Sequence, residues 1–335
     1  MGAVDTAPFF GGDVGGRPIV RLERVFICSS IVRPLDWSAA KFASRRVRRI
    51  APAYYCSIFV VVISATIVSG WAGWMPLVDV FVHGLFLHNL FPEFIVGING
   101  AYWTLGVEAG FYLVAMLCAP WLRSKERCLW VFSAWCGCAV LWRLGVYILA
   151  PTDAWTRFFF ATQLPGCMDG FAVGGLVAYG ERYWANWKWF RSIALFRAGY
   201  FSSVFLMALF YLVFGYLWFF GEEYWFRFGS AVVWRLVLYA SFGGLLIYFM
   251  KLNESDGVGA LLSASGLPAL GKVSFSFYLY HIPMIGFVSW AWRIAGMGSE
   301  WGGLILVMFV LSYCVAKLSY SYVEAPFISR KSAES

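Results

Sequence analysis

Long apolar segments recur along most of the chain, separated by short polar stretches. They cover residues 53–71, 103–122, 128–150, 164–180, 195–220, 230–250, 272–293 and 302–322. About 20 apolar residues are what an α-helix needs to cross the hydrocarbon core of a bilayer. The pattern therefore predicts an all-α fold, a polytopic membrane helical bundle with about eight spans.

One further apolar segment, 77–96, breaks this pattern because polar residues and a proline interrupt it. They are Asp79, His83, His88, Pro92 and Glu93. Irregular backbone at membrane depth is tolerated only where protein covers it or where it lines a water-filled cavity. We therefore expect segment 77–96 to be re-entrant, leaving the membrane on the side where it entered, and to lie beside a cavity.

Basic residues predict the orientation of the helices, because cytoplasmic loops of membrane proteins are enriched in Lys and Arg. A dense cluster, SRRVRR at 44–49, precedes the first apolar run. If 77–96 is re-entrant, this cluster and the RSKER loop at 123–127 share one side. The predicted outer loops then hold few basic residues, so both termini are expected to be cytoplasmic.

The composition indicates a membrane protein and excludes a soluble globular protein. Hydrophobic residues make up 61% of the 335 residues and charged residues only 13%, whereas a soluble domain carries about 25% charged residues. The net charge of +8 is explained by basic cytoplasmic loops in a lipid bilayer and requires no nucleic-acid partner. The eight Cys residues lie in apolar segments without metal-binding spacing, so we expect no disulfide scaffold and no metal site.

The chain divides into three parts by composition. Residues 1–40 are Gly-rich and charged, and we expect them to form an irregular N-terminal segment without a signal peptide. Residues 41–328 hold the apolar runs and form one membrane domain. Residues 329–335 are expected to be a polar cytoplasmic tail.

A few ionisable residues fall inside predicted spans, where they are costly and often functional. They are Glu108, Arg143, Asp169, Arg235, His281 and Lys317. Each Arg has two interpretations: a structural ion pair with Glu108 or Asp169 across helices, or a functional charge. Lys317 lies near a predicted inner end, from which its long side chain can reach the interface.

Two of these groups are candidates for proton transfer. Glu108 shares a helical face with Tyr112 and other aromatic residues, and a carboxylate among aromatic rings suits acid–base chemistry. His281 lies mid-span, where a lone His is more often a hydrogen-bonded core residue than a catalyst. His83 and His88 are five residues apart and do not share a helical face, which makes them a poor metal pair.

Two further patterns each have a structural and a functional interpretation. Gly166, Gly170 and Gly174 recur every four residues and predict close helix packing. The Arg residues of 45–49 either anchor the topology against anionic lipid or bind phosphate, since a guanidinium group makes bidentate phosphate contacts. Four Arg residues exceed what orientation needs, which favours a phosphate site.

Four motifs, taken in order, resemble the acyltransferase-3 family, integral-membrane enzymes that O-acylate bacterial surface polysaccharides, lipid-linked sugars and some small metabolites. They are SRRVRRIAPAYY, AYWTLGVEAGFYLV, QLPGCMDGFAVGGLVA, and VSFSFYLYHIPM followed by YVEAPF. The matching positions are Arg46, Arg49, Trp103, Glu108, Phe111, Tyr112, Asp169, Gly174, Tyr278, His281, Glu324 and Pro326. The order and spacing of the motifs extend the resemblance over residues 41–328.

The resemblance implies a membrane O-acyltransferase in the inner membrane of a bacterium. Such an enzyme transfers an acyl group, here expected to be acetyl, from acyl-CoA to a hydroxyl of a sugar, a polysaccharide or a similar acceptor. Acyl-CoA is then a donor substrate, and no permanently bound cofactor and no metal are implied. The residues expected to bind acyl-CoA or the acceptor are Arg46, Arg49, Trp103, Tyr112, Asp169 and Tyr278.

Two departures from the family pattern change the expected site. The family's catalytic His lies on an N-terminal helix, whereas residues 1–40 hold no His and no span. We therefore expect this chain to lack that helix, and Glu108 and His281 are then the remaining candidates for a catalytic base, in a chain whose activity is open. Cys167 stands where the family usually has Arg, which predicts a missing cation near Asp169.

Two other functions stay open on the sequence. A carrier or flippase for a polar solute also uses intramembrane charges and a re-entrant segment, although no inverted repeat is visible. The second open function is that of an inert membrane scaffold derived from the family. CoA binding that depends on Arg46 and Arg49 would separate an enzyme from a carrier.

Overall fold

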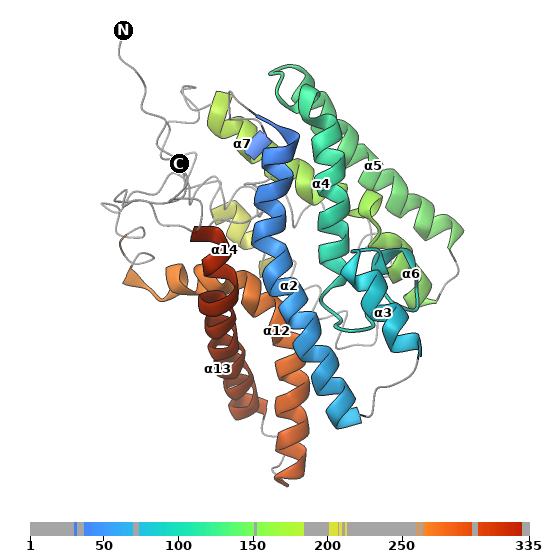
Figure 1. Ribbon diagram of the computed structural model, residues 1–335. Coiled ribbons are helices and arrows are strands. Elements are labelled where there is room, and N and C mark those ends of the chain that lie inside the picture. The colour runs from blue at the N-terminus through green and yellow to red at the C-terminus, as the bar shows by residue number, and fades with distance from the viewer. Residues whose placement is uncertain are drawn as a thin grey trace. The chain divides into compact units, whose positions relative to one another are not determined.

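The computed structural model contains only helices, turns and irregular segments among the residues that it describes (Figure 1). These residues are 30–31, 37–69, 74–150, 153–183, 201–206, 208–209, 212, 260, 264–296 and 301–329. The predicted all-α class is therefore confirmed. Four of the described helices are long and apolar enough to cross a membrane, namely Ala39–Ile67, Trp103–Leu122, Arg127–Leu149 and Gly303–Ile328.

The number of spans stays a prediction. The segments 164–180 and 272–293 are helical as expected, within longer helices. The segments 195–220 and 230–250 lie largely outside the described residues. Of the N-terminal segment 1–40, only residues 30–31 and 37–40 are described, and the tail 329–335 is described only at Ser329.

The chain forms two compact units, each described here by itself. The first, the α12 unit, comprises Met1–Pro18, Ser44–Trp71 and Asn253–Ser335. The second, the α4 unit, comprises Ile19–Ala43 and Ala72–Leu252.

Three long helices form the core of the α4 unit: α4 (Trp103–Leu122), α5 (Arg127–Leu149) and α7 (Leu164–Tyr183). Phe111 of α4 stacks on Phe171 of α7, with ring centroids 3.6 Å apart, and Trp135 of α5 packs edge-on against Phe111 at 5.1 Å. Such aromatic contacts bury large apolar areas and favour these two geometries. Ile31 of the N-terminal segment and Phe42, just after it, are fully buried in the same cluster.

Glycine allows α7 to approach its neighbours at two positions. A Cβ atom on Gly166 would lie 2.3 Å from the carbonyl oxygen of Ala161, and one on Gly175 would lie 2.2 Å from the ring of Phe132. The repeat of glycines every four residues predicts close packing at Gly166, and the structure agrees. It does not predict Gly175, because that residue falls outside the repeat.

Segment 77–96 is not one helix. Helix α3 (Trp74–Gly84) ends at Gly84, Phe86 has a positive φ of 59°, and a short 3₁₀ helix η1 (His88–Leu90) follows before turns that lead to α4. A positive φ is a genuine outlier for a bulky residue, so the chain direction changes at a defined point. The predicted interruption is present, whereas a re-entrant path through a membrane stays a prediction.

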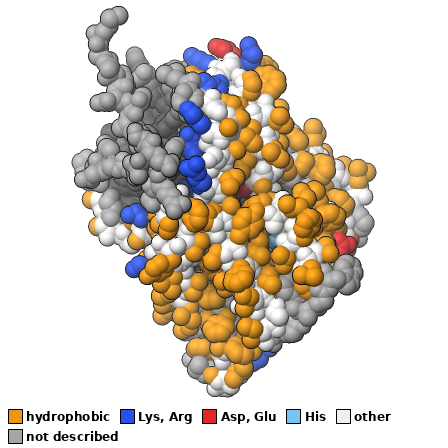
Figure 2. Space-filling view, in the orientation of Figure 1, with side chains coloured by type: hydrophobic (Ala, Val, Ile, Leu, Met, Phe, Trp, Pro, Cys, Tyr) orange, Lys and Arg blue, Asp and Glu red, His pale blue; other side chains and the backbone are white. Residues whose placement is uncertain are grey.

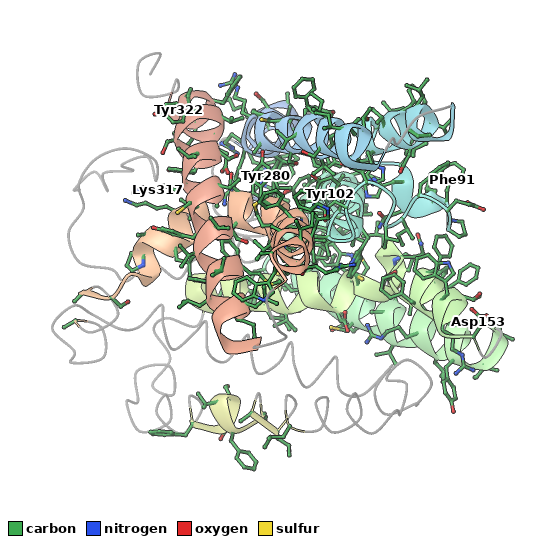
Figure 3. The ribbon with its side chains drawn as sticks, turned by 90° about the horizontal axis from the view of Figure 1, so that it is seen from below. Phe91, Tyr102, Asp153, Tyr280, Lys317 and Tyr322 are labelled. Carbon is green, nitrogen blue, oxygen red and sulfur yellow. The ribbon has the colours of Figure 1, made fainter. Side chains whose placement is uncertain are left out.

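The α12 unit contains most of α2 (Ala39–Ser69), then α12 (Leu267–Ile294), α13 (Trp301–Ser319), the π-helix η4 (Tyr320–Glu324) and α14 (Ala325–Ser329). Helices α12 and α13 lie side by side (Figure 1). Ser276 near the start of α12 contacts Ser319 at the end of α13, so the two helices run antiparallel. The hydroxyl of Tyr280 on α12 lies 3.8 Å from Cys56 Sγ on α2 (Figure 3).

On the face seen in Figure 2, hydrophobic side chains cover much of the described surface. Leu117, Trp130 and Leu149 are 73%, 77% and 84% exposed, as expected for side chains that face lipid rather than water. Lys317 is exposed and extends outward from α13 (Figure 3), and its reach to a membrane interface stays a prediction.

Candidate functional site

The basic cluster lies on the first turns of α2, in the α12 unit. Arg46 and Arg49 are three residues apart, so their side chains share one side of the helix. Both are half-buried, whereas Val47 and Arg48 are exposed. Figure 2 shows Lys and Arg side chains gathered toward the end of the visible face where α2 begins in Figure 1. Two guanidinium groups on one side of a helix are suited to bind a phosphate group.

His281 lies on α12 of the same unit with one ring nitrogen occupied. Its Nδ1 atom is 2.6 Å from the carbonyl oxygen of Tyr278, and the ring of Phe277 is parallel to the imidazole at 6.4 Å. A carbonyl oxygen can only accept a hydrogen bond, so Nδ1 carries the proton and Nε2 keeps its lone pair. The side chain is half-buried. His281 is therefore prepared to accept a proton at Nε2, and the Tyr278 carbonyl holds the required tautomer.

A buried carboxylate near the end of α13 was not singled out for its chemistry by the sequence patterns. Glu324 is 3% exposed and closes the π-helix η4. The Ser276 hydroxyl donates a short hydrogen bond to its carboxylate, and Ser276 Oγ lies 2.9 Å from Ser319 Oγ. A π-helix frequently marks a functional position, but only the tertiary structure brings residues 276 and 324 together.

Glu108 of α4 lies in the α4 unit. Tyr112 donates a short hydrogen bond from its phenolic hydroxyl to the Glu108 carboxylate, as the i, i+4 spacing predicts. The Tyr112 ring packs edge-on against Phe42 at 5.9 Å. Phe111 of the predicted aromatic face instead stacks on Phe171 in the core. A half-buried carboxylate beside a phenol can accept a hydrogen bond from a hydroxyl-bearing ligand or exchange a proton with it.

Trp103 begins α4 and is held on both its backbone and its ring. Asn89 Nδ2 donates to the Trp103 carbonyl oxygen at 2.6 Å. The Trp103 ring packs edge-on against Phe158 of α6 (Ala154–Ala161), with centroids 5.8 Å apart. Trp103 and Glu108 therefore lie within the first two turns of one helix.

Asp169 forms a buried ion pair with Arg143. Arg143 Nη2 lies 2.7 Å from Asp169 Oδ2, and Arg143 Nη1 donates to the Gly166 carbonyl at 2.6 Å. Of the pairings that the sequence leaves open, the structure selects this one, while Arg235 lies outside the described residues. The prediction of a missing cation near Asp169 is wrong, because α5 supplies the guanidinium group that position 167 does not.

His83 and His88 form a stacked pair that the sequence spacing does not suggest. Their ring centroids lie 4.0 Å apart with planes 2° from parallel. The argument from helical spacing does not hold for this pair, because α3 ends at Gly84, between the two residues. His83 Nδ1 lies 2.8 Å from Asp79 Oδ1. No group of three metal-ligating side chains occurs within the described ranges.

Burial makes His88 a weak base. It lies outside the four membrane-crossing helices, and desolvation, together with the neighbouring His83, lowers the pKa of His88 to about 3. A general base works best with a pKa near the operating pH. His88 is therefore neutral at pH 7 and poorly suited to remove a proton from a substrate.

The predicted site residues fall into two groups. Arg46, Arg49, Tyr278 and His281 lie in the α12 unit, where the structure brings Tyr278 and His281 together. Trp103, Glu108, Tyr112 and Asp169 lie in the α4 unit, where Glu108 contacts Tyr112 and Asp169 is enclosed by Arg143.

Comparison with known proteins supports the resemblance. A family model described as an acyltransferase domain matches residues 25–317. The chain is also similar to the O-acetyltransferase OatA of Staphylococcus aureus strains NCTC 8325, COL and MRSA252, with 25% identity over 252 residues. The alignment covers 71% of this chain but only 37% of each relative, so the chain spans little more than a third of their length. No solved structure matches the chain significantly.

The matched range contains the Arg pair of α2, the Trp103–Tyr112 motif, Asp169 and His281. The match covers well over half of the chain. The chain therefore belongs to the acyltransferase-3 family of membrane acyltransferases.

Proposed function

We propose that this acyltransferase transfers an acetyl group from acetyl-CoA to a hydroxyl group of a sugar, a polysaccharide or a similar acceptor. The family supports acyl transfer, and the relatives named O-acetyltransferase OatA favour acetyl as the group and oxygen as the acceptor atom. The observation that carries the proposal is the geometry of His281, whose Nδ1 proton is directed at the Tyr278 carbonyl and whose Nε2 atom keeps its lone pair.

In this mechanism His281 Nε2 removes the proton from the acceptor hydroxyl. The oxygen attacks the thioester carbonyl, and a tetrahedral oxyanion forms. The oxyanion collapses, the C–S bond breaks, and CoA leaves as a thiolate that takes up the proton from His281. A base of this kind contributes about 10²–10⁴-fold to the rate.

Arg46 and Arg49 are proposed to bind the phosphates of the donor. Charge-assisted hydrogen bonds from guanidinium groups are roughly twice as strong as neutral ones. Because acyl-CoA is a cytoplasmic substrate, this role requires the start of α2 to face the cytoplasm. This orientation agrees with the positive-inside rule. We propose that the protein lies in a bacterial plasma membrane with both termini in the cytoplasm.

The acceptor is proposed to contact the aromatic and acidic residues of the motifs. In the α4 unit, Trp103 and Tyr112 offer ring faces to a sugar, and the Glu108 carboxylate accepts hydrogen bonds from its hydroxyls. Tyr278 of the α12 unit is a further candidate for binding the acceptor or the donor. Asp169 is fully buried and bonded to Arg143, so its contribution would come from shaping the site. Glu108 is the alternative base.

Donor binding is tested with the full chain in lipid nanodiscs and calorimetric titration of CoA. We expect Arg46→Ala with Arg49→Ala to weaken CoA binding by about tenfold or more, since hydrogen bonds to charged groups contribute roughly 1.5–3 kcal/mol. Arg293→Ala, which removes an exposed Arg near the end of α12, is the control and should bind like wild type. Equal CoA affinity of wild type and the double variant would show that the Arg pair does not bind the donor.

The base is tested with radiolabelled acetyl-CoA and a panel of oligosaccharide acceptors. His281→Ala should lower kcat by about 10²-fold or more while CoA affinity stays unchanged. Glu108→Gln should have the smaller effect if Glu108 binds the acceptor. Transfer that survives His281→Ala and fails in Glu108→Gln would move the base to Glu108. A wild-type chain that binds CoA and transfers nothing to any acceptor would contradict the proposed function.

A further inference from the structure

Two adjacent residues of η1 donate side-chain hydrogen bonds to the first two carbonyls of the α4 segment. His88 Nε2 lies 3.0 Å from the Tyr102 carbonyl oxygen, and Asn89 Nδ2 donates to the Trp103 carbonyl oxygen at 2.6 Å. Because a carbonyl oxygen only accepts, the His88 proton sits on Nε2. The break after α3 thus returns the chain so that residues 88 and 89 contact residues 102 and 103.

The contact between η1 and α4 is close. A Cβ atom on Gly106 would lie 2.4 Å from Asn89 Oδ1, so a larger residue at 106 would displace the Asn89 amide. His88 is fully buried and Asn89 is 6% exposed. The two donors therefore have one defined geometry.

A third side chain, the amide of Gln163, ties this contact to α6. Gln163 Nε2 donates to the Asn89 carbonyl at 2.8 Å and to the Phe159 carbonyl at 3.0 Å. Phe158, the residue before Phe159, packs on the Trp103 ring. Trp103 is thus fixed on its backbone by Asn89 and on its ring by Phe158, and Gln163 joins the two supports.

These contacts show that His88 and Asn89 support the backbone of the Trp103–Tyr112 motif and are not part of the motif. His88 Nε2 and Asn89 Nδ2 each donate a hydrogen bond to a backbone carbonyl oxygen. Neither side chain is exposed enough to touch a substrate. The carbonyls they hold belong to Tyr102 and Trp103, and Glu108 follows five positions after Trp103 on the same helix.

We propose that His88 and Asn89 are positioning residues for acyl transfer, which orient the first turns of α4 so that Trp103 and Glu108 meet the acceptor. This inference rests on the proposed function of the same motif. Misplacement of a catalytic or binding group by about 1 Å can cost 10²-fold in rate, so loss of either donor reduces turnover without removing any group that contacts the substrate.

The test compares variants that keep or remove the donor, with kcat measured per folded molecule after size-exclusion chromatography. His88→Leu and Asn89→Asp remove it, and we expect kcat to fall about tenfold or more. His88→Gln keeps an N–H that can reach the Tyr102 carbonyl, and we expect it to stay within about threefold of wild type. Affinity for CoA should stay within about twofold in all of them, because binding by Arg46 and Arg49 does not use α4.

Ser312→Ala is the matched control. Ser312 is buried in α13, and its hydroxyl donates to the Met308 carbonyl at 2.7 Å, so the variant also loses one buried side-chain-to-backbone hydrogen bond. Its folded fraction should turn over like wild type. If His88→Leu did the same, the His88 bond would be structural only. If His88→Gln were as inactive as His88→Leu, the hydrogen bond to the Tyr102 carbonyl would not be what positions α4.

A second readout does not depend on activity. Amide hydrogen exchange at residues 103–108 should become faster in His88→Leu and Asn89→Asp than in wild type and in Ser312→Ala. Unchanged exchange in this segment would overturn the positioning role even if the wild-type chain transferred no acetyl group. Absent transfer with the expected exchange would instead contradict only the proposed function.

Discussion

Asp169 and Glu324 are both buried carboxylates, and the two units hold them in different ways. Asp169 of the α4 unit is fully buried and contacts the Arg143 guanidinium group, which also bonds the Gly166 carbonyl. Glu324 of the α12 unit is 3% exposed and receives the hydroxyl of Ser276, which lies next to Ser319. The described partner of Asp169 is an opposite charge, and Ser276 offers Glu324 a neutral hydroxyl donor.

The two arrangements should differ in how much stability is lost when the partner of the carboxylate is removed. A buried ion pair is not by itself strongly stabilising, but removing one member leaves an uncompensated charge. Removing a neutral hydroxyl costs one hydrogen bond. We therefore expect loss of the Arg143 guanidinium group to cost more stability than loss of the Ser276 hydroxyl.

The largest effect should follow from Arg143→Met. This variant leaves Asp169 buried beside no guanidinium group, and we expect it to lose about 3–5 kcal/mol of stability. Chemical unfolding in mixed micelles measures the loss. Asp169→Leu combined with Arg143→Met should recover much of it, because an apolar pair of similar volume carries no buried charge.

The recovery in the double variant is the control that identifies charge as the cause. If the double variant were as unstable as Arg143→Met, packing around α5 and α7 would explain the loss. If Arg143→Met were as stable as wild type, Asp169 would be neutral when folded, and the comparison with Glu324 would fail.

Acid should weaken the α4 unit by a smaller amount. The pKa of His88 is lowered from 6.5 to about 3 by burial and by His83. Between these values the unfolded chain binds a proton that the folded chain does not, so stability decreases as the pH falls below 6.5 and levels off near 3. The slope is at most about 1.4 kcal/mol per pH unit, which gives a loss of about 2 kcal/mol at pH 5.

Unfolding curves of wild type and His88→Gln between pH 7.5 and 5 measure this effect. Gln keeps the hydrogen bond to the Tyr102 carbonyl but does not titrate, so its stability should fall less over the same range. Equal pH dependence of the two proteins would mean that other groups cause the acid sensitivity.

Ser276→Ala should have the smallest effect of the three. The variant removes the hydroxyl that donates to Glu324 and contacts Ser319, and a loss of about 1 kcal/mol is expected for such a hydrogen bond. The measurement is the same unfolding experiment. A loss as large as that of Arg143→Met would show that Glu324 depends on Ser276 as strongly as Asp169 depends on Arg143.

The helices of the described chain were largely predictable from the sequence. The apolar runs 103–122 and 128–150 correspond to α4 and α5 almost residue for residue, because a helix that crosses a membrane needs a continuous apolar length. The break in segment 77–96 was predictable as well, because its polar residues and proline do not fit a spanning helix. The position of the break at Gly84 and Phe86 was not predictable, since it depends on the backbone conformation of one residue.

The candidate site was predictable where its contacts are local. The Glu108–Tyr112 contact follows from the i, i+4 spacing on one helix. The contacts between distant residues did not follow: Asn89 with Trp103, Ser276 with Glu324, and His83 with His88. For Arg143 the sequence left two acidic partners open, and only the packing of α5 on α7 selected Asp169.

The sequence by itself determined that this protein is an all-α membrane protein and, through its motifs, which family it belongs to. Both properties depend on residue types and their spacing along the chain, because lipid requires long apolar helices and the motif residues are close in sequence. The tertiary structure decided which buried charges are paired and what holds the start of α4. These properties depend on atoms from distant parts of the chain, whose distances are set only when the helices pack.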